Sequence, residues 1–280
     1  AEARGRDRGM DIRLKHRLAR SPLRRPLESL RAGVGKLGAL RRPELALLRH
    51  EQDYLDRFLS RTIRRDWTCV DVGGHVGSFS AELARLAPKG RLIIVEADPE
   101  KAKMLAEGFP KAIVHAVAVS DEDGEATFYR NTTRPGYSSL SDRSDRGRTE
   151  AVTVPRRRLD GLLADEEVRF VKLDVEGFEL EAVRGAHDTF ARCRPILVFE
   201  AGAAADRAID TSKADALFAA LTAEMGYDVF APMDLAFHRP PLDASAFDRY
   251  RRYPFLAFNY VAIPRLDPSA DPAPKQGERP

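Results

Sequence analysis

From residue 66 onward, short apolar segments typical of buried strands alternate with segments of helical periodicity. Strands that alternate with helices in this way form a mostly parallel sheet with helices on both faces. The expected strands are 68–72, 91–97, 112–119, 168–174 and 195–200, and the expected helices are 78–87, 99–108, 159–165, 178–190 and 212–225. GYDVFAP and FLAFNYVAIP follow as a final strand pair, so we predict an α/β fold with one antiparallel strand.

Two further segments, GEATFYR and TEAVTVP, alternate polar and apolar residues between the third and fourth parallel strands. This pattern predicts an antiparallel excursion from the main sheet. The segment between them, NTTRPGYSSLSDRSDRGR, is rich in glycine, serine, asparagine and aspartate, which is the composition of a loop. We interpret GYSSL, with Tyr137 and Ser138, as a candidate substrate lid and an ordinary loop as the alternative.

Charge divides the chain of 280 residues unequally. Residues 1–50 carry a formal charge of +9, whereas the remaining residues carry −6. We expect residues 1–59 to form a basic helical extension, 60–264 a single catalytic domain, and 265–280 a disordered Pro-rich tail. The basic extension is either a solvated arm packed on the domain or a peripheral contact for anionic lipid.

Other features of the composition exclude several classes of protein. No apolar run approaches the roughly 20 residues that span a bilayer. Aromatic residues are scarce in the basic segment and the rest of the chain is acidic, which argues against a nucleic-acid partner. The two cysteines form neither a CxxC motif nor a pair with histidine, so we predict a reducing, cytoplasmic location. The sequence does not indicate an oligomeric state.

Acidic residues stand at the ends of several predicted strands: Asp71, Glu96, Asp174 and Glu200. Ligands of open parallel sheets bind outside the carboxyl ends of the strands. The fourth of the five parallel strands runs directly into KLDVEGFELEAVRG, in which Asp174 ends the strand and Glu176 follows it. A helix N-cap would explain one or two of these carboxylates. It does not explain Lys172 within the strand, so we expect a binding site at this edge.

The first strand continues into a glycine loop, VDVGGHVGSF. Gly73 and Gly74 permit positive φ and close backbone approach, and Gly77 lets the next helix pack closely. The dinucleotide fingerprint G-x-G-x-x-G is incomplete because position 72 is valine. Asp71 suits a ligand with cationic groups, and Glu96 at the next strand end can accept both ribose hydroxyls. This pair fits S-adenosylmethionine better than NAD.

The motifs together resemble the FkbM family of class I S-adenosylmethionine-dependent methyltransferases, over residues 66–263. The resemblance rests on VDVGGHVGSFS, IIVEAD, AVAVSDEDGEATF, YSSL, RLDGLL, VKLDVEGFELEAVRGA and ILVFE, in this order and spacing. It implies a Rossmann-like sheet of seven strands whose last strand is antiparallel. It also implies an O-methyltransferase for a hydroxyl of a sugar, glycolipid or polyketide-type natural product.

The resemblance also implies roles for individual residues. Those at the cofactor would be Asp71, Gly73, Gly74, Gly77 and Glu96, with Ala118 and Ser120 near the adenine. Gly74-His75 departs from the family, which has a small residue and asparagine there. Asp174 would face the transferred methyl group.

Several residues are candidates for the chemistry. A positioned base that accepts the alcohol proton contributes about 10²–10⁴-fold. The candidates for this base are Asp174, Glu200 and His238, while Lys172 and Glu176 pair with them or bind the acceptor. Mg²⁺ held by the clustered carboxylates is an alternative. Two other functions stay open: an NAD-type oxidoreductase, and a non-catalytic binding module docked on a membrane.

Overall fold

The computed structural model describes residues 48–133, 138–142, 144, 147–201, 212–253 and 255–265. Most of the predicted basic helical segment and nearly all of the predicted Pro-rich tail lie outside these residues, so both stay predictions. No helix in the described part of the chain has the length and apolar character needed to cross a bilayer.

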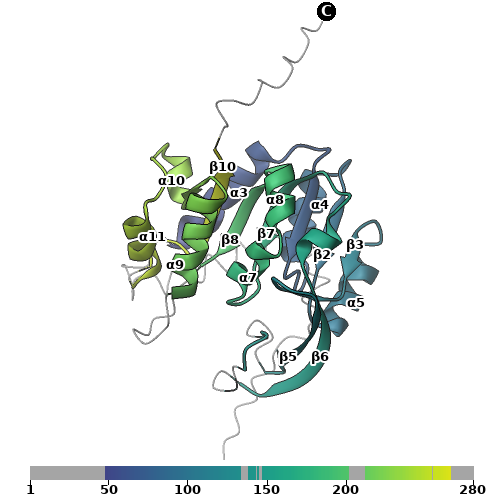
Figure 1. The fold of residues 1–280 in the computed structure, drawn as a ribbon. Helices are drawn as coiled ribbons and strands as arrows, with labels where there is room; N and C mark the ends of the chain where they lie inside the picture. The colour runs from purple at the N-terminus through teal and green to yellow at the C-terminus, as the bar shows by residue number, and fades with distance from the viewer. Residues whose placement is uncertain are drawn as a thin grey trace, which may run out of the picture.

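Seven strands form the main sheet in the order β3-β2-β1-β7-β8-β10-β9 (Figure 1). Strand β10 pairs antiparallel with both of its neighbours, and the remaining pairs are parallel. The predicted sheet with an antiparallel last strand is thereby confirmed. The strands are β1 (Thr68–Val72), β2 (Leu92–Val95), β3 (Ile113–His115), β7 (Val168–Leu173), β8 (Ile196–Glu200), β9 (Tyr227–Phe230) and β10 (Asn259–Pro264).

Helices cover both faces of this sheet, because alternate side chains of the buried strands point to opposite faces. Two apolar clusters result. One joins β1, β7 and β8 to helices such as α8 and α9, and the other joins the opposite face to α3 and α4 (Figure 1). The helices are α3 (Glu51–Thr62), α4 (Ser78–Leu86), α5 (Pro99–Gly108), α6 (Leu159–Leu162), α7 (Glu179–Arg184), α8 (His187–Cys193), α9 (Ser212–Ala219), α10 (Pro232–Ala236) and α11 (Ala244–Arg251).

A second, smaller sheet has the order β4-β6-β5, with β4 at Ala118–Val119, β5 at Gly124–Asn131 and β6 at Thr149–Arg157. Strands β5 and β6 pair antiparallel, which confirms the predicted excursion. They project from the main sheet on the side where α7 lies, which is the side of the carboxyl ends of the parallel strands (Figure 1). Ser139 makes an isolated bridge to Tyr129, so the chain at 138–140 folds back against β5.

Two predicted elements are interrupted. The expected strand 112–119 divides into β3, at the edge of the main sheet, and β4, which pairs with β6. The expected helix 178–190 divides into α7 and α8 around Gly185. A Cβ at Gly185 would lie 2.0 Å from the Ser120 carbonyl oxygen, so the chain passes too close there for a side chain.

Helix α3 belongs to the packed unit, although the sequence placed residues 51–59 in the basic extension. Leu55 and Leu59 are buried in the cluster between α3 and the sheet. The Glu51 carboxylate accepts hydrogen bonds from the backbone N–H groups of Phe258 and Asn259, at 2.7 and 2.9 Å. Helix α3 therefore packs on the sheet, and the domain boundary at residue 60 stays a prediction.

Candidate active site

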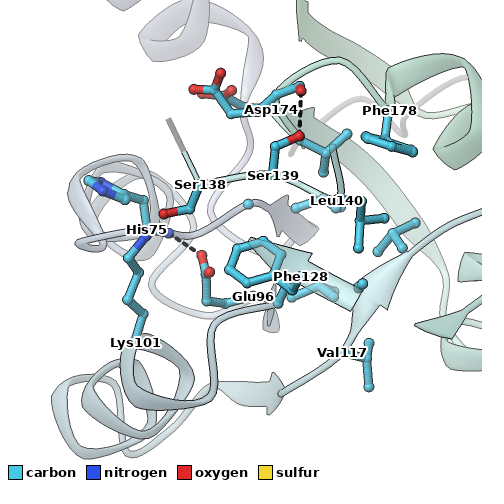
Figure 2. Close-up of a pocket in the computed structure, with 18 residues that line it drawn as sticks. His75, Glu96, Lys101, Val117, Phe128, Ser138, Ser139, Leu140, Asp174 and Phe178 are labelled. Atoms are coloured by element: carbon cyan, nitrogen blue, oxygen red, sulfur yellow. Dashed lines mark hydrogen bonds between the residues drawn. The ribbon is translucent and has the colours of Figure 1, made fainter. Parts of the chain in front are cut away.

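A cavity of about 270 Å³ lies at the carboxyl ends of β1, β2 and β7, with the smaller sheet along one side. Glu96 and Asp174 stand on different sides of it, and Ser138, Ser139 and Leu140 pass between them (Figure 2). The lining residues are Val72, Gly73, His75, Val95, Glu96, Ala97, Lys101, Val117, Ala118, Val119, Phe128, Ser138, Ser139, Leu140, Asp174, Val175, Glu176 and Phe178.

Two backbone hydrogen bonds fix the Glu96 carboxylate in the cavity wall. Its Oε2 accepts from the His75 N–H at 2.7 Å (Figure 2). Its Oε1 accepts from the Asp98 N–H at 2.9 Å. Burial raises the pKa of Glu96, and the Lys101 charge and these N–H groups oppose the rise. The carboxylate is held in one orientation, with its other lone pairs available to hydroxyl donors.

The glycine loop approaches Asp174 closely. Gly73 has φ +85°, and its N–H donates to the Val95 carbonyl at 2.8 Å. A Cβ at Gly73 would lie 1.8 Å from the Asp174 carbonyl oxygen. Only glycine fits both the positive φ and this contact.

We expect Gly73→Ala to lower the free energy of unfolding by at least about 2 kcal/mol, because strain at φ and a backbone clash add together. Gly161→Ala is the matched control, since a Cβ there meets nothing within 4 Å. Urea unfolding of both variants measures the difference. A Gly73→Ala variant as stable as Gly161→Ala would show that the loop can move aside.

Asp174 follows the last residue of β7 and lines the cavity with a side chain that is 36% exposed. Its N–H donates to the Val72 carbonyl at 3.0 Å, which fixes the backbone at this point. Its Oδ2 lies 3.5 Å from Lys172 Nζ. Glu176 also lines the cavity, and its carbonyl accepts from Ser139 Oγ at 3.0 Å (Figure 2). A carboxylate thus faces the cavity on a different side from Glu96.

Glu200 ends the neighbouring strand β8 and does not line the cavity among the described residues. Burial first, and then the charge of Asp174, raise the pKa of Glu200 to about 8, against the opposing charge of Lys172. At pH 7 the Glu200 carboxyl is therefore mostly protonated. In that form it can donate a hydrogen bond, and the role of Glu200 as a candidate base stays a prediction.

The raised pKa of Glu200 implies a pH-dependent stability. The protonated form is favoured by the fold, so its stabilising effect is complete below the ordinary glutamate pKa and is lost as pH rises through about 8. We expect Tm to fall less between about pH 6 and about pH 9 in Glu200→Gln than in the parent. Glu107→Gln, at an exposed position on α5, is the control. Calorimetric scans give Tm against pH for the parent and both variants. If the three profiles are parallel, Glu200 does not contribute to the pH dependence of stability.

The structure places Asp71, Gly74 and Gly77 behind the cavity wall. The Asp71 carboxylate is buried and accepts from Ser80 Oγ at 2.5 Å, so direct contact with a cationic ligand is not supported. A Cβ at Gly74 would lie 2.5 Å from Ile94 Cγ2, and Gly77, at φ +80°, precedes α4. These residues shape the loop.

Five other predicted residues lie in different places. Ser120 is buried and its hydroxyl donates to Asp121 at 3.1 Å, away from the described cavity lining. His238 is exposed in the turn after α10 and is absent from that lining. Ala118 and Ser138 both line the cavity, and their predicted contacts with the adenine and the acceptor stay predictions. Tyr137 lies outside the described residues.

Sequence reasoning missed several lining residues, among them His75, Lys101, Phe128 and Phe178. In the sequence, His75 stands out only as a departure from the family pattern. In the structure, its backbone N–H donates a hydrogen bond to the Glu96 carboxylate. The alternation in GEATFYR predicted a strand. It did not show that Phe128, on the apolar face of that strand, lines the cavity. Lys101 and Phe178 had no local signal, because their places depend on α5 and on the turn before α7.

Metal binding gains no support. Within the part of the chain that the structure describes, no three His, Cys, Asp or Glu side chains are grouped to hold a metal ion. The carboxylates near Asp174 are arranged around Lys172 instead.

The cavity fits S-adenosylmethionine. Glu96 presents a fixed carboxylate suited to a ribose diol, and Gly73 forms part of the cavity wall. Apolar side chains, including Val117, Ala118 and Phe128, form a wall suited to an adenine ring. Together with the strand order and the antiparallel β10, this site defines a class I S-adenosylmethionine-dependent methyltransferase.

The chain belongs to the FkbM methyltransferase family, because the family model "Methyltransferase FkbM domain" matches residues 71–229. The match favours the methyltransferase over the NAD-type oxidoreductase. The chain is also similar to the AMB antimetabolite synthetase AmbE of Pseudomonas aeruginosa, with 27% identity over 197 residues. This match covers 53% of the chain and 9% of AmbE.

Among solved structures, the chain is similar to the methyltransferase FkbM of Methylobacillus flagellatus, with 17% identity and a TM-score of 0.44. That match covers 71% of this chain and 44% of the other, so the chain spans less than half of either protein. A methyltransferase of Aquifex aeolicus described as SAM dependent has 12% identity, a TM-score of 0.36, and coverage of 79% and 91%.

Proposed function

We propose that the protein is an S-adenosylmethionine-dependent O-methyltransferase that acts on a hydroxyl of a sugar, glycolipid or polyketide-type natural product. The observation that supports this most is that Asp174 lines the same cavity as Glu96. A carboxylate able to accept a proton thus shares one space with a carboxylate suited to the cofactor ribose.

In this proposal, Glu96 binds the ribose hydroxyls and the apolar wall around Ala118 holds the adenine. The cofactor, when bound, supplies an electrophilic methyl group. Asp174 accepts the proton of the acceptor hydroxyl as the new C–O bond forms. Glu200, which does not line the cavity, has no contact with the acceptor in this proposal. Orientation of the two reactants within one enclosed site contributes roughly 7–11 kcal/mol in favourable cases.

The acceptor class follows from the groups at the Asp174 side. Asp174 and Glu176 offer acceptor oxygens, which suit a molecule with several hydroxyl donors. The similarity to a segment of an antimetabolite synthetase supports a natural-product acceptor.

A screen with methyl-labelled S-adenosylmethionine tests this function. Neutral sugars, glycolipids and polyketide alcohols are offered separately, and labelled products are treated with mild base. We expect a labelled methyl ether, which survives the base. A base-labile methyl ester, or label on nitrogen alone, would contradict O-methylation of a hydroxyl.

A further inference from the structure

Lys172 is a buried cation directly behind the cavity wall. It lies in β7, its side chain is 7% exposed, and it is absent from the cavity lining among the described residues. Its Nζ is 3.5 Å from Asp174 Oδ2, donates to the Leu173 carbonyl at 3.4 Å, and lies 5.8 Å from the centroid of the Phe79 ring. The ammonium group is thus held on several sides, and its ionic contact points toward the cavity.

Four carboxylates from separate parts of the chain surround Lys172. Asp71 on β1 stands beside it in the parallel register, and Asp174 lies two residues after it, just beyond the end of β7. Glu200 ends β8, on the other side of β7, and Glu51 belongs to α3 on the same face. Lys172 lowers the pKa of Asp71, Glu51 and Glu200, in each case against the larger effect of burial.

Only one of these four acids, Asp174, lines the cavity. A buried ammonium group is tolerated when it is paired with a charge and hydrogen-bonded. Here the pairing brings the positive charge against the one carboxylate that faces the acceptor. An unpaired Asp174 would be repelled by Glu200 whenever both are ionised, and it could rotate away from the cavity.

We propose that Lys172 is a positioning residue whose ammonium group, from behind the cavity wall, pairs with the Asp174 carboxylate and holds it directed toward the acceptor hydroxyl. This inference rests on the proposed function, in which Asp174 is the base. The sequence left two roles for Lys172, pairing with the candidate carboxylates or binding the acceptor. The inference takes the first role, because Lys172 contacts Asp174 and is absent from the cavity lining among the described residues.

The test is a carboxyl ¹³C NMR titration of the full chain from about pH 4 to about pH 10, which covers the titration range of carboxyl groups. The parent is compared with Lys172→Met, which removes the charge, and with Lys172→Arg, which keeps it. Lys89→Met is the matched control, since Lys89 is exposed in the turn between α4 and β2. Signals are assigned with Asp174→Asn and Glu200→Gln. S-adenosylhomocysteine affinity is measured by calorimetry on every variant.

We expect Lys172→Met to raise the titration midpoints of Asp174 and Glu200 by about one pH unit or more. Lys172→Arg and Lys89→Met should titrate as the parent does, and all four proteins should bind S-adenosylhomocysteine equally. Parental titration in Lys172→Met would overturn the inference. So would a tenfold loss of S-adenosylhomocysteine affinity with unchanged titration, because it would place Lys172 at the cofactor.

Different measurements test the role of Lys172 and the proposed function. A parent protein that does not bind S-adenosylhomocysteine contradicts the function, while the titration still decides whether Lys172 controls Asp174. If Lys172→Met does not fold, the ¹⁵N signal of the Lys172 side chain in the parent decides. A protonated ammonium group at pH 7 supports the inference, and a neutral amine overturns it.

Discussion

Asp174→Asn is expected to lower kcat by about 100-fold or more and to leave the affinity for S-adenosylhomocysteine nearly unchanged. The substitution keeps the shape of the side chain and removes the charge that accepts the proton. An interaction made mainly in the transition state affects kcat rather than ground-state binding. The rate is measured with the acceptor found in the labelled-methyl screen, and the affinity by calorimetry.

The control for this variant is Asp165→Asn, in the exposed turn before β7 at the opposite end of the same strand. It should retain parental turnover. Activity of the parent in EDTA, with no gain on adding Mg²⁺, would separate the base from a metal ligand. Near-parental turnover by Asp174→Asn would reduce Asp174 to a structural residue at the strand end.

Glu96→Ala should weaken S-adenosylhomocysteine binding by about 1–3 kcal/mol, or roughly 5- to 150-fold in Kd, since the ribose hydroxyls lose their acceptor. The variant also leaves the N–H groups of His75 and Asp98 without the carboxylate that they now bind. We therefore expect a lower Tm as well, which thermal unfolding measures.

Glu107→Ala is the control, because Glu107 is exposed on α5 and does not line the cavity. This substitution removes the same kind of side chain as Glu96→Ala. Circular dichroism establishes that both variants are folded. Parental affinity in a folded Glu96→Ala protein would remove Glu96 from the cofactor site.

The sequence was informative wherever the signal is local. The helix expected at 99–108 is α5, which begins at Pro99 with the Asp98 side chain accepting from the Glu100 N–H. The five parallel strands were identified because each is a short apolar segment followed by turn or cap residues. Such features depend on neighbours along the chain.

Features that depend on distant contacts were not predicted. The apolar residues of 112–119 look alike in the sequence, yet β3 and β4 pair in different sheets. The break between α7 and α8 follows from contact of Gly185 with the carbonyl of Ser120, which is far away in the chain.

Asp71 and Asp174 show the same limit within the candidate site. Both were placed at strand ends, but Asp71 lies inside β1 and Asp174 lies one residue beyond β7. That difference buries Asp71 against Ser80 on α4 and leaves Asp174 in the cavity wall. A shift of one residue at the end of a strand cannot be resolved from the apolar pattern alone.

Calorimetric titration of the parent protein with S-adenosylhomocysteine, and separately with NADH, tests the assignment of the cavity most directly. We expect one S-adenosylhomocysteine to bind per chain with a Kd in the micromolar range, and no heat from NADH. Binding of NADH without S-adenosylhomocysteine, or no binding of either, would contradict a cavity built around Glu96 for this cofactor.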